Sequence, residues 1–201
     1  DDPTASGGAY YGLFPVISSG ALIRNVGVTN SYISSRMYAG AIAGFSCPSG
    51  EEIHPQFSGC YADETVTLNG TSVGGILGGG SLTANFDNCY FTGTLLTTGN
   101  TINGIVGDFW SSDWSLINSY VRGYTVYRDG FQPKICMNVY STVEQSGVKA
   151  LTVAQMTGEA AKKNMSGFDW GLVWESTDST PILLIIPENY VPGGGDGTPG
   201  E

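Results

Sequence analysis

The residues best suited to chemistry are tyrosines that recur at one position of a repeated segment. The segment reads Phe86-Asp-Asn-Cys-Tyr-Phe91, and similar segments begin at residues 23, 57, 116 and 136. In a strand that turns Cys89 and Phe91 inward, the tyrosine points outward. A row of such rings can stack on sugars or anchor a protein partner, or the rings can stack on one another as scaffold. The candidate binding residues are Tyr61, Tyr90, Tyr120 and Tyr140.

Four cysteines stand at positions 47, 60, 89 and 136, and no two form a CxxC or another zinc-binding spacing. We therefore expect no metal site. Cys60 and Cys89 share one inward position in neighbouring segments, where parallel side chains are seldom oriented for a disulfide, so we expect buried thiols. Cys47 and Cys60 would close an insertion between them, and this pair is the candidate disulfide.

Other groups could support catalysis, but they form no recognised motif. His54, the only histidine, lies beside Glu51 and Glu52, and is either a general base or metal ligand or the solvated tip of a loop. Paired carboxylates would suit a polysaccharide-cleaving enzyme. Those considered do not recur at one repeat position, and GxSxG is absent: Asp63, Asp87, Asp108 and Asp113. We expect no enzyme activity and no cofactor, with a β-helix polysaccharide hydrolase or lyase as the alternative.

The elements that position these residues repeat with a period of about 30 residues. An apolar, glycine-containing segment at Val73–Gly78 returns at residues 39–44 and 102–107. Between Cys89 and Leu95, apolar and polar residues alternate with the period of a strand, and no helical period stands out between residues 11 and 145. The chain is therefore predicted to be all-β: a right-handed parallel β-helix, or β-solenoid, in which stacking supplies the core.

Two sets of residues mark this repeat. The isoleucines Ile42, Ile76 and Ile105 should stack in one interior column. An asparagine or glycine precedes the strand of each repeated segment, and these residue types most readily adopt the left-handed conformation of a corner. The corner residues are Asn25, Gly59, Asn88, Asn118 and Asn138. Their amides could also form a hydrogen-bonded ladder.

The chain divides into four parts by pattern. Residues 1–10 are an approach segment, residues 11–147 the solenoid, residues 148–188 a cap of helix and strands, and residues 189–201 a linker or tail rich in glycine and proline. In the cap, Thr152 and Gln155 form a capping box for a helix that extends to Asn164. Short strands are expected within residues 168–174 and 182–186. This cap should cover the open C-terminal end of the stack.

Charge and hydropathy exclude several classes of partner. The net charge is −10 and the eight lysines and arginines are scattered, which argues against nucleic acid. The longest apolar runs are far shorter than the 18 or so residues of a membrane span, so this segment should not insert into a membrane. The opening Asp1-Asp-Pro is that of a mature or excised segment.

The repeats resemble the GLUG-type repeat of bacterial exported and cell-surface proteins. Its typical unit is an apolar residue, Asn-Cys-Tyr, a short strand and then Val-Gly-Gly-Leu-Val-Gly, which Asn88–Tyr90 and Val73–Gly78 match closely. The resemblance covers residues 11–141, and residues 151–186 look like the ending that often follows such repeats. An insertion at residues 46–56 and a shortened fourth coil depart from the pattern.

This resemblance implies a module of a secreted or surface-displayed multidomain protein, without catalytic residues of its own. The expected function is a rigid spacer or an adhesive surface. The expected partners are a glycan or a host or cell-surface protein, together with further domains of the same polypeptide.

Overall fold

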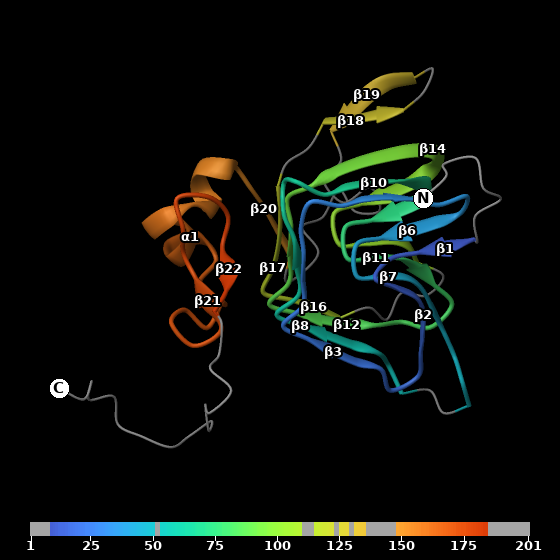
Figure 1. Ribbon diagram of the computed structural model, residues 1–201, viewed down its shortest axis with the longest axis horizontal. Helices are drawn as coiled ribbons and strands as arrows, with labels where there is room; N and C mark the ends of the chain where they lie inside the picture. Colours follow the sequence, from blue (N-terminus) through green and yellow to red (C-terminus); the bar gives the residue numbers. More distant parts are fainter. Residues whose placement is uncertain are drawn as a thin grey trace.

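The computed structural model describes residues 9–50, 53–109, 115–122, 125–128, 131–135 and 148–184. Within these ranges the chain forms a parallel β-solenoid, and the predicted fold class is confirmed. Figure 1 looks along the stack, so the coils appear as superposed loops with several sides. Each full coil contributes a strand to each of four sheets, which we name A to D in the order that the chain visits them.

Strands at equivalent positions of successive coils pair in parallel. Sheet A contains β1 (Tyr10–Tyr11), β6 (Tyr38–Gly40), β10 (Thr67–Gly74), β14 (Thr94–Asn103) and β18 (Thr125–Arg128), with β5 (Tyr32–Ser34) also on β10 and β19 (Phe131–Ile135) antiparallel to β18. Sheet B contains β2 (Phe14–Ser18), β7 (Ala43–Cys47), β11 (Leu77–Gly80) and β15 (Val106–Phe109).

The other two sheets follow the same order. Sheet C contains β3 (Leu22–Arg24), β8 (Gln56–Ser58), β12 (Asn85–Asp87) and β16 (Ser115–Ile117). Sheet D contains β4 (Gly27–Val28), β9 (Tyr61–Ala62), β13 (Tyr90–Phe91), β17 (Ser119–Arg122) and β20 (Val148–Leu151). Because the ladder hydrogen bonds join one coil to the next, the sheets hold the stack together along its axis.

The interior is filled by columns of like residues. Ile42, Ile76 and Ile105 are all buried, and the amide of Ile42 donates to Ile76 while the amide of Ile76 donates to Ile105. The predicted isoleucine column is thus confirmed. Phe57 and Phe86 stack in the same way, with ring centroids 4.7 Å apart and planes 7° from parallel. Regular burial of this kind is what a single coil lacks and stacking provides.

The predicted corner is confirmed at the four described positions. Asn25, Asn88 and Asn118 have φ values of 53°, 53° and 46°, and Gly59 has 63°. These values lie in the left-handed region that asparagine and glycine tolerate. The chain turns there from sheet C into sheet D. The fifth predicted corner residue, Asn138, lies outside the described residues.

The assignment of a shortened coil after residue 120 is wrong. Sheet D continues from β17 to β20 with the register Tyr120↔Lys149 and Val121↔Ala150. Lys149, and not Tyr140, therefore occupies the next position of the tyrosine column. The Asn-x-Tyr pattern at residues 138–140 suggested the shorter step, whereas the pairing of β17 with β20 keeps the step of about 30 residues seen in the preceding coils. Tyr140 itself lies outside the described residues.

The C-terminal segment forms the expected elements in modified form. It contains the 3₁₀ helix η1 (Val153–Met156), helix α1 (Gly158–Asn164) and a two-stranded antiparallel sheet of β21 (Trp174–Glu175) and β22 (Ile182–Leu183). The capping box of Thr152 and Gln155 is confirmed. The single predicted helix is instead split, because Gly158 has a φ of 54°, outside the helical region.

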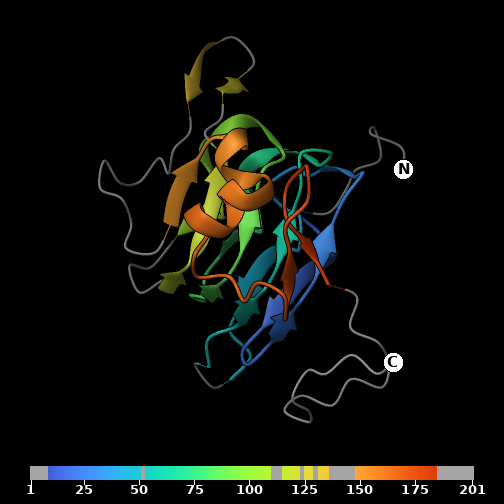
Figure 2. The ribbon, with the colours of Figure 1, turned by 90° about the vertical axis from the view of Figure 1, so that its left-hand side faces the viewer.

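This segment does not cover the end of the stack, which corrects the prediction. The segment from η1 to β22, which we call the cap, lies against the side formed by sheet D (Figures 1 and 2). In Figure 2 the orange and red cap stands in front of the strands it covers. β20 is still a strand of sheet D and η1 begins two residues later, so the chain turns back over that sheet directly after leaving it.

Candidate functional site

The tyrosine column lies on the outer side of sheet D. β9, β13 and β17 pair so that Tyr61 faces Tyr90 and Tyr90 faces Tyr120 in register. The rings of Tyr61 and Tyr90 are stacked, with centroids 5.0 Å apart and planes 16° from parallel. Their alignment in one column, predicted from the repeat, is therefore confirmed.

The predicted exposure of these rings is wrong. The exposed fractions of Tyr61, Tyr90 and Tyr120 are 9%, 0% and 2%. Alternation along a strand identifies which residues share a face, but it does not reveal whether a later segment covers that face. Here the cap does so, and both faces of β9 and β13 are buried. The tyrosines are accordingly not available to a sugar or protein ligand while the cap is in place.

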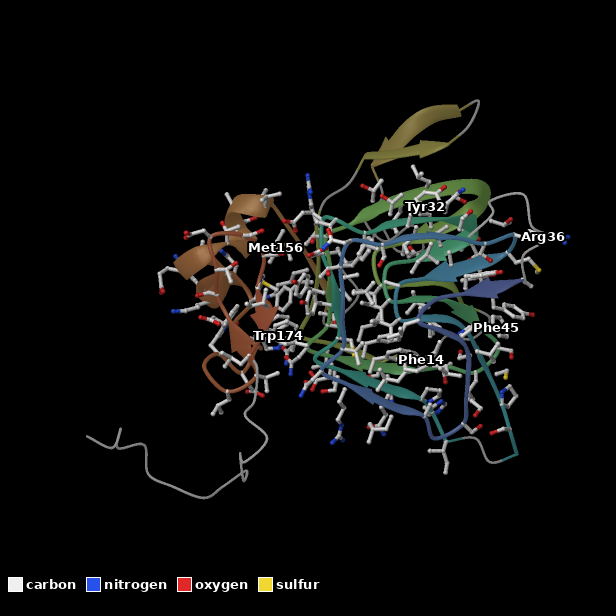
Figure 3. The ribbon with its side chains drawn as sticks, in the orientation of Figure 1. Phe14, Tyr32, Arg36, Phe45, Met156 and Trp174 are labelled. Carbon is white, nitrogen blue, oxygen red and sulfur yellow. The ribbon has the colours of Figure 1, made fainter. Side chains whose placement is uncertain are left out.

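The covering side chains are apolar and mostly aromatic. The ring of Trp174 lies 5.8 Å from that of Tyr61 and 5.6 Å from that of Tyr90, and Phe168 meets Tyr120 edge-on at 5.2 Å. Phe168 and Trp174 stack on each other at 4.3 Å. Figure 3 shows Trp174 and Met156 at the boundary between cap and stack. The buried cluster is completed by Leu151, Met156, Ala161 and Met165.

Sequence reasoning assigned these apolar cap residues to the wrong surface. The unused signal was the tyrosine column itself. Three outward rings on neighbouring coils form an apolar strip. When an aromatic segment follows such a strip directly in the sequence, that segment is expected to cover it. Trp174 and Phe168 come within 25 residues of the end of sheet D at Leu151.

Hydrogen bonds hold the cap in register with the column. The hydroxyl of Tyr90 donates to the carbonyl of Pro181, and the amide of Gly167 donates to the hydroxyl of Tyr120 over 3.3 Å. Burial raises the pKa of Tyr90 well above its usual value, and burial is also the main cause of the raised pKa values of Tyr61 and Tyr120. The neutral phenols are therefore the form that this interface favours.

A carboxylate at the edge of the interface accepts two further hydrogen bonds. Glu64 follows β9, and its oxygens accept from the hydroxyls of Ser179, at 2.8 Å, and Thr180, at 3.1 Å. Partial burial alone would raise the pKa of Glu64. Hydrogen bonds from its own backbone amide and from these hydroxyls, together with the charge of Arg122, outweigh burial and lower it. Glu64 thus links the solenoid to the cap in its ionised form.

The cysteines do not form the predicted disulfide. Cys47 ends β7 on sheet B, whereas Cys60 lies at the corner that leads into β9, and both are free thiols. Cys60 and Cys89 are fully buried, as expected for inward positions. Their thiols donate weakly to the carbonyls of the preceding coil: Cys60 to Ile23 at 3.6 Å and Cys89 to Phe57 at 3.7 Å.

The other candidate residues are not brought together. Asp108 lies in β15 of sheet B, Asp87 in β12 of sheet C and Asp63 directly after β9 of sheet D, so the three belong to different sides of the coil. Nδ1 of His54 lies 2.5 Å from the hydroxyl oxygen of Thr83. In the part of the chain that the structure describes, no three His, Cys, Asp or Glu side chains gather as metal ligands. Glu51, Glu52 and Asp113 lie outside that part.

No family model, curated protein or solved structure matches this chain. The structure itself adds one observation on membranes: none of the helices in the described ranges has the length and apolar character of a membrane span.

Proposed function

We propose that this chain is a non-catalytic, rigid spacer module of an exported bacterial cell-surface or secreted multidomain protein. The observation that carries the proposal is the joining of successive coils by parallel ladders on four sides, with an interior column that runs through the stack. A load along the axis is shared by many hydrogen bonds at every coil boundary. Bacterial export and surface location rest on the resemblance of the repeats to the GLUG type.

Burial of the tyrosines favours the spacer over the adhesive surface. Tyr61, Tyr90 and Tyr120 are the residues from which adhesion was inferred, and they contact the cap instead. A glycan or cell-surface protein would have to bind elsewhere or displace the cap. The enzyme alternative receives no support from Asp63, Asp87 and Asp108, which come from three different sheets.

Single-molecule force spectroscopy tests the spacer function. The chain is placed between two marker domains and pulled by its ends. We expect the coils to stay folded as force rises and then to unfold in one or two cooperative events, since each boundary is held by several ladders. Ile76→Ala, which opens a cavity in the interior column, should lower that force.

Gradual lengthening at low force would contradict the proposal. A glycan array probed with the intact chain separates the adhesive reading from the spacer. Specific binding that survives Tyr90→Phe and Tyr120→Phe would place adhesion on another surface, and would replace the spacer as the main function.

A further inference from the structure

The loop that joins β21 to β22 (residues 176–181) is the polar edge of the cap. It meets the solenoid through hydrogen bonds, whereas the centre of the interface is apolar and aromatic. Oε1 of Glu64 accepts from the hydroxyl of Ser179 at 2.8 Å, and Oε2 accepts from the hydroxyl of Thr180 at 3.1 Å. The carbonyl of the next residue, Pro181, accepts from the hydroxyl of Tyr90. Two side chains of the solenoid therefore fix this part of the loop.

The same loop is joined to the rest of the cap through Thr177. The amide of Gly158, the first residue of α1, donates to the carbonyl of Thr177 at 2.7 Å. The hydroxyl of Thr177 donates to the carbonyl of Thr180 at 3.0 Å and accepts from the amide of Ser179 at 3.0 Å. The contact with Glu64 is thus connected to the helix of the cap.

The two bonds to Glu64 depend on an ionised acceptor. A carboxylate accepts on both oxygens, and hydrogen bonds to a charged acceptor are about twice as strong as neutral ones. Protonation turns one oxygen into a donor, so the carboxyl no longer matches two donating hydroxyls. Because Thr180 is buried, water does not readily replace a weakened bond to its hydroxyl.

The surroundings of Glu64 favour its ionised form. Partial burial would raise its pKa, but the hydrogen bonds and the charge of Arg122, at the end of β17, lower it. Asp63 precedes Glu64 in the chain and Asp178 lies in the loop, and like charges act in the opposite direction. The charge of Glu64 in turn adds to burial, the main cause, in raising the pKa of Tyr90, which keeps that phenol protonated.

We propose that Glu64 is an acid-sensitive latch, whose protonation loosens the cap on sheet D and so uncovers the tyrosine column. The docked chain holds the proton of Glu64 less tightly than the undocked chain does. The contribution of the latch is therefore complete above the undocked pKa of about 4.3, and it is lost as the pH falls through the lower pKa of the docked state. The latch does not depend on the spacer function.

Hydrogen exchange of the full chain at about pH 6 and about pH 3 tests the latch. Protection factors, which correct for the intrinsic effect of pH on exchange, are compared between two groups of amides. The amides of Gly158 and Leu184 bond within the cap, and the amide of Ile76 bonds within the interior column. Acid should lower the protection of the cap amides, relative to that of Ile76, by about threefold or more, because charge-assisted bonds are lost.

Two variants assign the response to one carboxyl group. Glu64→Gln keeps an acceptor oxygen but cannot ionise, so it should show the lower relative protection at both pH values. The matched control is Glu175→Gln, at an exposed position of β21 in the cap, which should respond to acid as the wild type does. Melting curves at pH 6 verify that both variants fold. A wild-type chain with equal relative protection at both pH values would overturn the proposal, as would a Glu64→Gln variant that keeps the wild-type response.

Discussion

Tyr90 shows how one residue can belong to two layers. Its backbone pairs with β9 and β17, while its fully buried ring stacks on Tyr61 and contacts Trp174. Its hydroxyl, buried with the ring, donates to the carbonyl of Pro181. A buried hydroxyl without a partner is costly, so this bond also fixes where the strand β22 can lie. Tyr90 is therefore a structural residue that joins cap and solenoid.

Substitution of Tyr90 should separate packing from hydrogen bonding. Tyr90→Ala should lower the free energy of unfolding by about 3–5 kcal/mol, as large-to-small changes of buried aromatics do. Tyr90→Phe leaves the Pro181 carbonyl unpaired and should cost about 1–3 kcal/mol. Urea denaturation measures both. The control is Tyr32→Ala, at a ring exposed to 64%, which should change stability by less than about 0.5 kcal/mol. Equal stabilities of Tyr90→Ala and wild type would mean that the cap is not docked.

The buried phenols should make the fold sensitive to alkali. The pKa of Tyr90 is raised in the folded state, mainly by burial, so the folded chain holds this proton more tightly than the unfolded chain. The stabilisation is complete below the unfolded pKa of about 10 and is lost as the pH rises from there toward the folded pKa. Urea denaturation between about pH 9 and pH 11 measures the decline. Tyr90→Phe should show a shallower decline, and an identical slope would exclude Tyr90 as its source.

At the scale of elements, sheet D differs from a sheet that has one face exposed to solvent. Its inner side contacts the solenoid core, and its outer side contacts η1, α1 and the β21–β22 pair. The short cap elements are stabilised by this contact more than by themselves, since a helix of seven residues is not stable alone in water. The cap and sheet D therefore form one cooperative unit.

Deletion of residues 152–187 tests this dependence. It would expose three aromatic rings on adjacent strands, and we expect large soluble aggregates by light scattering in place of the native species. Removal of residues 192–201 alone is the control and should leave the scattering unchanged. A truncated chain with native scattering and an unchanged melting temperature would show that the solenoid needs no cover on sheet D.

At the scale of the whole molecule, the stacked coils and the cap form two packed layers that share sheet D. The cap covers the outer side of sheet D, and the inward side chains of the first coil, Ile17, Ile23 and Val28, are buried members of the solenoid core. The proposed spacer function follows from this geometry, because ladders on four sides join each coil to the next along the axis.

The sequence by itself determined the features that depend on its repeats. Periodicity predicted the parallel coils, the column of Ile42, Ile76 and Ile105, and the left-handed corner at Asn25, Asn88 and Asn118. These features depend on contacts between equivalent residues of neighbouring coils, and equivalence is visible as self-similarity. The alignment of Tyr61, Tyr90 and Tyr120 was predictable for the same reason.

Only the tertiary structure decided the contacts between segments that do not resemble one another. That Trp174 and Phe168 pack on the tyrosines, and that Lys149 follows Tyr120 in the column, depends on the path of the chain after the repeats end. No periodicity encodes such a contact, because each partner occurs once. An apolar strip on the outside of sheet D indicates that another segment covers it. The path of the chain beyond β20 determines that this segment is the cap.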